Sequence, residues 1–264
     1  MKHIGFLVIA ATLFDFSVAH AVPLPRPRPA QAPTVPRAQA PAVPPAEKAE
    51  PAEPDAPPPL SACRLRLTTE LAIAPSLPPL TGPGGCGGED IVRLEAVVLA
   101  DKHRVALIPP ATVRCTFAEA IVQWVREDVA AAVRSLKATL KSIDNFDSYE
   151  CRGRNRVSGA KLSEHGRANA LDIRSLLLGN GTRIELTDPQ ASKDFREALR
   201  KSTCVRFSTV LGPGSDGYHE NHIHVDLAER RGGYRMCQWD VREPDEELGA
   251  AAVPLPKPRP DFDP

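Results

Sequence analysis

The sequence predicts an α+β domain in which a small antiparallel sheet is flanked by helices and held together by disulfides. Short apolar runs of strand length alternate with two helical stretches between residues 60 and 243. The dipeptide Asn180-Gly181 separates two of these runs, and Asn-Gly is a strong signal for a tight hairpin turn. All six cysteines of the chain also lie in this stretch, which is typical of a disulfide-stabilised exported domain.

Strands are predicted where apolar runs are bounded by turn residues. The predicted strands are Val92–Ala100, Val105–Ile108, Leu171–Leu177, Thr182–Leu186, Phe207–Leu211 and His222–Leu227. The first two flank a polar turn at residues 101–104, and the next two flank the Asn180-Gly181 turn. These short connections favour antiparallel pairing.

Two helices are predicted from capping signals and apolar periodicity. Thr116-x-x-Glu119 has the form of a capping box. The apolar stripe that follows it consists of Ile121, Trp124, Val125, Val129, Ala132 and Leu136. Ser192 is expected to begin the second helix, which carries Phe195 and Leu199.

Composition divides the chain into four segments. Residues 1–21 have the features of a secretory signal peptide, with the apolar run Ile4–Phe16 and a cleavage signature at Ala19-His20-Ala21. Residues 22–59 contain half of the 28 prolines and are expected to form an extended linker. Residues 60–243 form the predicted domain, and 244–264 are a proline-rich tail. We therefore expect a periplasmic or secreted protein without a membrane span.

The charge balance and the cysteines restrict the partners and the compartment. A net charge of zero argues against a nucleic-acid partner, because phosphate binding needs a basic excess. A cysteine zinc site would need close pairs such as C-x-x-C, which the sequence lacks, so disulfides are favoured. Fifteen connectivities are possible. Proximity in sequence alone favours Cys63–Cys86, Cys115–Cys151 and Cys204–Cys237.

Histidines and an aspartate form two short motifs, Ser163-Glu-His165 through Asp172 and His219-Glu-Asn-His222-Ile-His224. Histidine and carboxylate are the donors that hold a catalytic zinc. In a strand, His222 and His224 point to the same face. The seven residues from His165 to Asp172 suit a loop that enters a strand. Each residue alone could be an ordinary polar or capping residue, but the grouping predicts a metal site on the sheet.

The first motif resembles the S-x-H-x-x-G-x-A-x-D pattern of the zinc D-Ala-D-Ala peptidases and their lysostaphin-type relatives, with Ala168 where glycine is usual. The second resembles the H-x-x-H-x-H pattern of penicillin-insensitive murein endopeptidase. It departs from the dipeptidase branch, where a glutamate lies three residues before the last ligand. Asn221 occupies that position here, and Glu220 is one residue out of register.

Residues 60–240 resemble the bacterial extensin-like C-terminal family. The segment Ser148-Tyr-Glu-Cys-Arg-Gly-Arg-Asn155 and the two motifs carry this resemblance. Tyr149-x-Cys151-Arg152 is also similar to the Y-R-S segment of the zinc peptidases, whose arginine contacts substrate. Arg152 is therefore a candidate clamp for a carboxylate or carbonyl. The alternative is an ordinary surface arginine.

These resemblances imply a zinc peptidase that acts on peptidoglycan peptides. His165, Asp172 and His224 would hold the Zn²⁺. His222 would carry a proton or stabilise the oxyanion, with an imidazole pKa suited to that task, and His219 would orient its neighbours or bind substrate. The alternative is a non-catalytic, metal-containing module that binds the cell wall or has a structural role. A zinc buffer would need denser histidine tracts than the sequence has.

Overall fold

The computed structural model describes residues 59–244. The predicted signal peptide, almost all of the linker and the tail from residue 245 lie outside the described residues. The strands are β1 (Ala72–Ile73), β2 (Ser76–Leu77), β3 (Leu80–Thr81), β4 (Gly87–Gly88), β5 (Ile91–Val98), β6 (Arg104–Arg114), β7 (Leu140–Asp147), β8 (Ala170–Leu178), β9 (Arg183–Glu185), β10 (Thr209–Leu211), β11 (Ile223–Asp226) and β12 (Met236–Gln238).

The helices are α1 (Ala62–Arg66), α2 (Cys115–Trp124), the π-helix η2 (Val125–Val129), α3 (Ala130–Ser135) and α4 (Lys193–Arg206). Short 3-10 turns lie at η1 (Pro83–Gly85), η3 (Arg154–Arg156), η4 (His165–Arg167) and η5 (Arg231–Gly233). No helix within residues 59–244 is both long and apolar enough to cross a membrane.

One sheet organises the described domain, in the order β1-β5-β6-β7-β8-β11-β10-β12, with β2 beside β5 and β9 beside β8. The sheet has ten strands, so the prediction of a small sheet was wrong. It is also mixed, because β6 pairs with β7 and β10 pairs with β12 in parallel. The chain from β6 to β7 passes through α2, η2 and α3, the kind of helical crossover that joins parallel strands.

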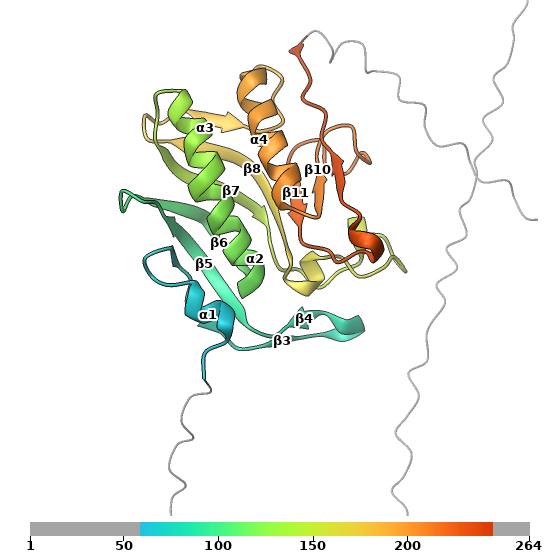
Figure 1. Cartoon of the computed structure of the whole chain (residues 1–264). Helices are drawn as coiled ribbons and strands as arrows, with labels where there is room; N and C mark the ends of the chain where they lie inside the picture. The colour runs from blue at the N-terminus through green and yellow to red at the C-terminus, as the bar shows by residue number, and fades with distance from the viewer. Residues whose placement is uncertain (1–58, 245–264) are drawn as a thin grey trace, which may run out of the picture. The chain divides into compact units, whose positions relative to one another are not determined.

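The helices α2, α3 and α4 lie over one face of the sheet (Figure 1). Their apolar side chains share a single core with the sheet residues that point the same way, such as Ile173 of β8 and Val225 of β11. Because side chains alternate along a strand, Asp172 and His224 point to the other face. The core therefore occupies one side of the sheet and leaves the opposite side for a polar site.

The hairpin and the second helix agree with the predictions. β8 and β9 pair around the turn, with Leu177 opposite Arg183, and Gly181 has the positive φ of 86° that its glycine permits. Ser192 is the N-cap of α4 and its hydroxyl accepts a hydrogen bond from the backbone N–H of Phe195. These two features are local, so the sequence alone specifies them.

The first predicted helix differs in its start and in its course. It begins at Cys115 after the N-cap Arg114, so the predicted capping box does not form, and Glu119 instead pairs with Arg66 at 2.7 Å. The π-helix η2 interrupts the α-helical period. The regular structure ends at Ser135, which leaves Leu136 of the predicted stripe 38% exposed.

Three disulfides join the cysteines, and no described cysteine is free. The pair Cys204–Cys237 was predicted correctly. The other two pairs are Cys63–Cys115 and Cys86–Cys151, so those two predictions were wrong. Proximity in sequence failed because the fold places α1 against α2 and the β4 loop beside the loop that follows β7.

Candidate metal centre

Strand register brings the three predicted metal ligands together. Asp172 of β8 lies directly opposite His224 of β11, and both point away from the helix-covered core. His165 lies in the short turn η4, five residues before Ala170 begins β8. The structure thus realises the expected path from a loop into a strand, and all three side chains are buried.

The three ligand atoms form a nearly equilateral triangle. His165 Nε2 lies 3.0 Å from His224 Nδ1 and 3.1 Å from Asp172 Oδ1, and His224 Nδ1 lies 2.9 Å from Asp172 Oδ1. Ligands at tetrahedral angles around a zinc ion with bonds of about 2.0–2.1 Å would be separated by roughly 3.3 Å. A displacement of a few tenths of an ångström would therefore suit the triangle to zinc.

Outer partners set the tautomers of both histidines. His165 Nδ1 lies 2.6 Å from the carbonyl oxygen of Ser148, which can only accept, so Nδ1 donates there. His224 Nε2 donates to Asp226 Oδ2 at 3.1 Å. The remaining ring nitrogens, His165 Nε2 and His224 Nδ1, then carry lone pairs that converge with Asp172 Oδ1. Such an arrangement of acceptors requires a cation, and these outer hydrogen bonds are typical of metal-binding histidines. The residues fit a zinc ion.

The pKa values of the site indicate that a proton would compete with a metal ion for the space between the three ligand atoms. Burial alone would raise the pKa of the Asp172 carboxyl, but its interactions with the His165 and His224 rings outweigh burial and hold the pKa well below its usual range. Burial lowers the pKa of His224, yet the carboxylates of Asp172 and Asp226 raise it to about 9. Without a metal, the site therefore holds a proton on His224.

His222 lies beside this triangle and is not part of it. Its Nε2 is 3.5 Å from Asp172 Oδ2, and its Nδ1 donates to Asn221 Oδ1 at 2.8 Å. The ring packs against Phe146, with the ring centroids 5.1 Å apart. Burial is the main cause that lowers its pKa, to about 4. The sequence analysis expected an imidazole pKa suited to proton transfer, and the pKa lies well below that of an ordinary imidazole: the ring is neutral at pH 7, with an unprotonated Nε2 beside the three ligand atoms.

His219 stands behind His222 and is oriented by an aspartate. Its Nδ1 donates to Asp216 Oδ1 at 2.6 Å, and its ring centroid is 5.1 Å from that of His222. Asp216 also accepts a hydrogen bond from Asn155 Nδ2 at 3.1 Å. His219 therefore lines the cleft, and its hydrogen-bond partner is Asp216, which is not one of the three candidate metal ligands.

Arg152 lines the cleft, but its guanidinium is already engaged. It donates to Asp147 Oδ2 at 3.0 Å and to Glu150 Oε2 at 2.8 Å, and its side chain is only 15% exposed. The burial agrees poorly with an ordinary surface arginine. The two ion pairs also argue against the prediction that Arg152 binds substrate, because two carboxylates already accept hydrogen bonds from its guanidinium.

Two departures from the family patterns have structural explanations. Ala168 has φ 53° and is fully buried, so this position adopts the left-handed conformation that glycine tolerates best. The glycine usual at this position would avoid that strain. Glu220 faces away from the metal triangle, since it accepts from Gly214 N at 2.9 Å and pairs with Arg242 at 3.3 Å.

The triangle lies in a cleft of about 710 Å³. Two exposed aromatic side chains belong to its lining, Phe146 (43% exposed) and Tyr218 (57%). A cavity of this size holds a drug-sized or short peptide ligand. The three candidate ligand side chains are therefore buried, while the site can be reached through the cleft.

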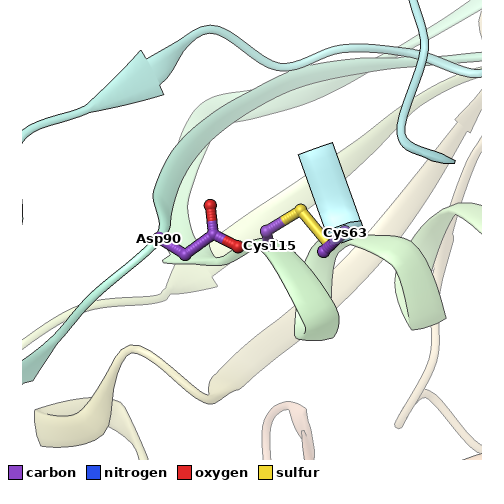
Figure 2. Close-up of side chains that lie close together, drawn as sticks. All are labelled: Cys63, Asp90 and Cys115. Atoms are coloured by element: carbon purple, nitrogen blue, oxygen red, sulfur yellow. A yellow bond between two sulfur atoms is a disulfide. The ribbon is translucent and has the colours of Figure 1, made fainter. Parts of the chain in front are cut away.

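A second group of three potential ligands exists among the described residues, namely Cys63, Asp90 and Cys115. Figure 2 shows the two sulfur atoms joined in a disulfide, with Asp90 beside them. Metal binding by cysteine needs the thiolate, and Asp90 is engaged by the Ser61 hydroxyl at 2.6 Å. In its oxidised form this group is a crosslink between α1 and α2.

Some residues of the site were missed by the sequence analysis. Asp226 could have been found, because it lies two residues after His224 and thus on the same face of the strand. The Ser148 carbonyl, Phe146 and Asp216 could not, since they come from β7 and from loops whose approach depends on the whole fold.

No curated protein and no solved structure matches the chain. One family model does match, and it confirms the extensin-like resemblance. The family model described as "Extensin-like protein C-terminus" matches residues 61–238, more than half of the 264-residue chain, and the chain therefore belongs to this extensin-like family.

Proposed function

We propose that this protein is an exported zinc-dependent peptidase that hydrolyses amide bonds in peptidoglycan cross-links. The observation that carries the proposal is the convergence of three lone pairs, from His165, Asp172 and His224, at the floor of an open cleft. A fourth side chain, His222, lies next to them without joining the triangle. Three protein ligands with a spare imidazole are typical of a catalytic zinc site.

His165, Asp172 and His224 would hold the zinc. When bound, the ion supplies an activated water and polarises the scissile carbonyl. The protein contributes the orientation of both imidazole rings, through the Ser148 carbonyl and the Asp226 carboxylate. Asp172 would bind the metal as a carboxylate, because its pKa is held well below the usual range by the two neighbouring histidines.

His222 would move the proton. Its Nδ1–H is held by Asn221, so the lone pair of Nε2 is available beside the metal triangle. A ring with a pKa of about 4 is neutral at physiological pH, so its lone pair is free, although it is a weak base. It also releases that proton readily, which suits delivery to the departing amine.

The substrate class is inferred from the cleft and from the motif. An extended peptide on both sides of the scissile bond suits an open cleft edged by the loop 212–217 and by exposed Phe146 and Tyr218. The His219-x-x-His222-x-His224 pattern resembles that of a murein endopeptidase, and Asn221 stands where the dipeptidase branch has glutamate. The signal peptide expected from the sequence would bring the domain to the cell wall.

The alternative is a non-catalytic module that binds or supports the wall and contains a metal. The low pKa of His222 favours this non-catalytic alternative, because a base with a pKa of about 4 accepts protons weakly at pH 7. Both functions would include the metal, and only the enzyme would turn over peptide.

The direct test is incubation of the zinc-loaded protein with purified cross-linked muropeptides, followed by chromatography. We expect conversion of cross-linked dimers to monomers, and no release of D-alanine from free D-Ala-D-Ala ends. Metal-free protein is the control. An absence of conversion across pH 5–9 would leave the wall-binding alternative.

Metal content gives a separate prediction. Protein prepared without chelator should contain about one zinc per chain, as expected for a single site with three protein ligands. Replacement of Asp172 with alanine should remove most of the bound metal, because two rings alone hold it weakly. His103→Ala is a matched control, since His103 contacts the Leu140 carbonyl at the start of β7, away from the cleft. Elemental analysis of both variants is the measurement, and a metal-free wild-type protein would contradict the proposal.

A further inference from the structure

One charged side chain that lines the cleft forms no hydrogen bond or ion pair within the part of the chain that the structure describes. The lining carboxylates each accept a hydrogen bond or ion pair from a neighbouring side chain. Among the lining arginines, Arg152 and Arg156 form ion pairs, and Arg230 donates to the Ser208 carbonyl and to Thr209. Arg154 lines the same cleft, yet its guanidinium forms no hydrogen bond or ion pair with another side chain among residues 59–244.

The backbone that carries Arg154 is nevertheless held in place. Its N–H donates to the carbonyl of Lys161 at 2.9 Å. The next residue, Asn155, has φ 52° and donates through its side chain to Asp216 Oδ2 at 3.1 Å. The backbone of this turn is therefore held at the cleft by hydrogen bonds, while the Arg154 side chain has no acceptor. An arginine on a flexible surface loop would lack such a fixed backbone.

A second uncommitted donor is linked to the same carboxylate. The backbone N–H of Tyr218 donates to Asp216 Oδ1 at 3.0 Å, so Asp216 joins the segment of Tyr218 to that of Arg154. The Tyr218 side chain is exposed and lines the cleft, and its hydroxyl makes no hydrogen bond to any residue between 59 and 244. Two side-chain donors without acceptors thus belong to the two segments that Asp216 joins.

We propose that Arg154 and Tyr218 form an anion subsite for a carboxylate of the peptide bound in the cleft. The inference deepens the proposed function and rests on it for the identity of the peptide. A guanidinium presents a planar fork that matches a carboxylate, and a phenol adds one further donor. A polyanion such as a phosphate-rich wall polymer would need a row of free cations. The other lining arginines are already engaged, so a single carboxylate fits better.

The test is equilibrium binding of cross-linked muropeptides in two forms, one with free carboxylates and one with these groups converted to amides. Titration calorimetry on the zinc-loaded full chain, in a His222→Ala background that prevents turnover, gives the affinities. Arg154→Ala should weaken binding of the carboxylate form about tenfold, the loss of one charge-assisted contact. It should leave the amide form unchanged. Tyr218→Phe should show a smaller loss of the same kind.

Arg104→Ala is the matched control, because Arg104 is an exposed arginine at the start of β6 and outside the cleft lining. Equal losses for the two muropeptide forms, or no loss, in Arg154→Ala would overturn the subsite even if the wild-type protein cleaves. A carboxylate-dependent loss in a protein that never cleaves would support the subsite and reject only the enzyme. Tighter Arg154-dependent binding of poly(glycerol phosphate) than of muropeptide would overturn the peptide assignment.

Discussion

Replacing His222 with alanine should lower the rate of muropeptide cleavage by about 10²–10⁴-fold, the usual effect of removing a general acid–base group. The same variant should keep its zinc, because His222 Nε2 lies 3.5 Å from Asp172 Oδ2 and outside the triangle of ligand atoms. The combination of lost turnover and retained metal separates a proton carrier from a ligand. Rate measurements and elemental analysis on the same preparation are needed.

The controls use the same type of substitution elsewhere. His165→Ala should lose both turnover and zinc, since His165 Nε2 is one corner of the triangle. His103→Ala should lose neither. If His222→Ala lost its metal, His222 would be a fourth ligand, which is the arrangement typical of a structural zinc site, and the wall-binding alternative would gain support.

Local sequence signals explain why the grouping of these side chains could be predicted. His224 alternates with Ile223 in β11, so the strand presents its ring on the face opposite the core, and His222 lies on the same side just before the strand begins. The connection from His165 to Asp172 needs only a turn before β8. Neither the alternation in β11 nor the turn before β8 depends on contacts between distant residues. The one long-range requirement is that β8 and β11 are neighbours in the sheet.

Long-range features could not be predicted in the same way. The central strand β7 was missed because Ser142 and Asn145 are buried there and break the apolar pattern. Two predicted disulfide pairs were wrong because the bonded cysteines are separated by 52 and 65 residues in the sequence and are brought together by the fold. The ion pairs that engage Arg152 come from Asp147 and Glu150, whose positions depend on the end of β7.

The stability of the metal-free protein should fall as the pH rises from about 6.5 to 9. His224 has a folded-state pKa of about 9 against about 6.5 in an unfolded chain. Because the pKa is higher in the folded state, protonation of His224 stabilises the fold. This stabilisation is fully present below pH 6.5, the unfolded pKa, and is lost as the pH rises to the folded pKa of about 9. It amounts to something on the order of 3 kcal/mol for this difference in pKa. His222 acts in the opposite direction, since its pKa of about 4 removes stability as the pH falls below 6.5. The metal-free protein should therefore be most stable near pH 6.5.

Zinc should cancel this loss of stability on the alkaline side. Proton and zinc compete for one atom, His224 Nδ1, which donates to Asp172 Oδ1 when protonated and would bind the metal when neutral. Binding at pH 7–8 should release about one proton per zinc, so the affinity should rise about tenfold per pH unit until the pH reaches the pKa of His224. Urea unfolding at pH 6.5, 7.5 and 8.5, with zinc and with chelator, measures both slopes. Calorimetry in buffers of different ionisation enthalpy counts the protons. His103→Ala should follow the wild type in each. A metal-free protein that gains stability over this range would show that His224 is not protonated in the empty site, and zinc binding without proton release would place the metal elsewhere.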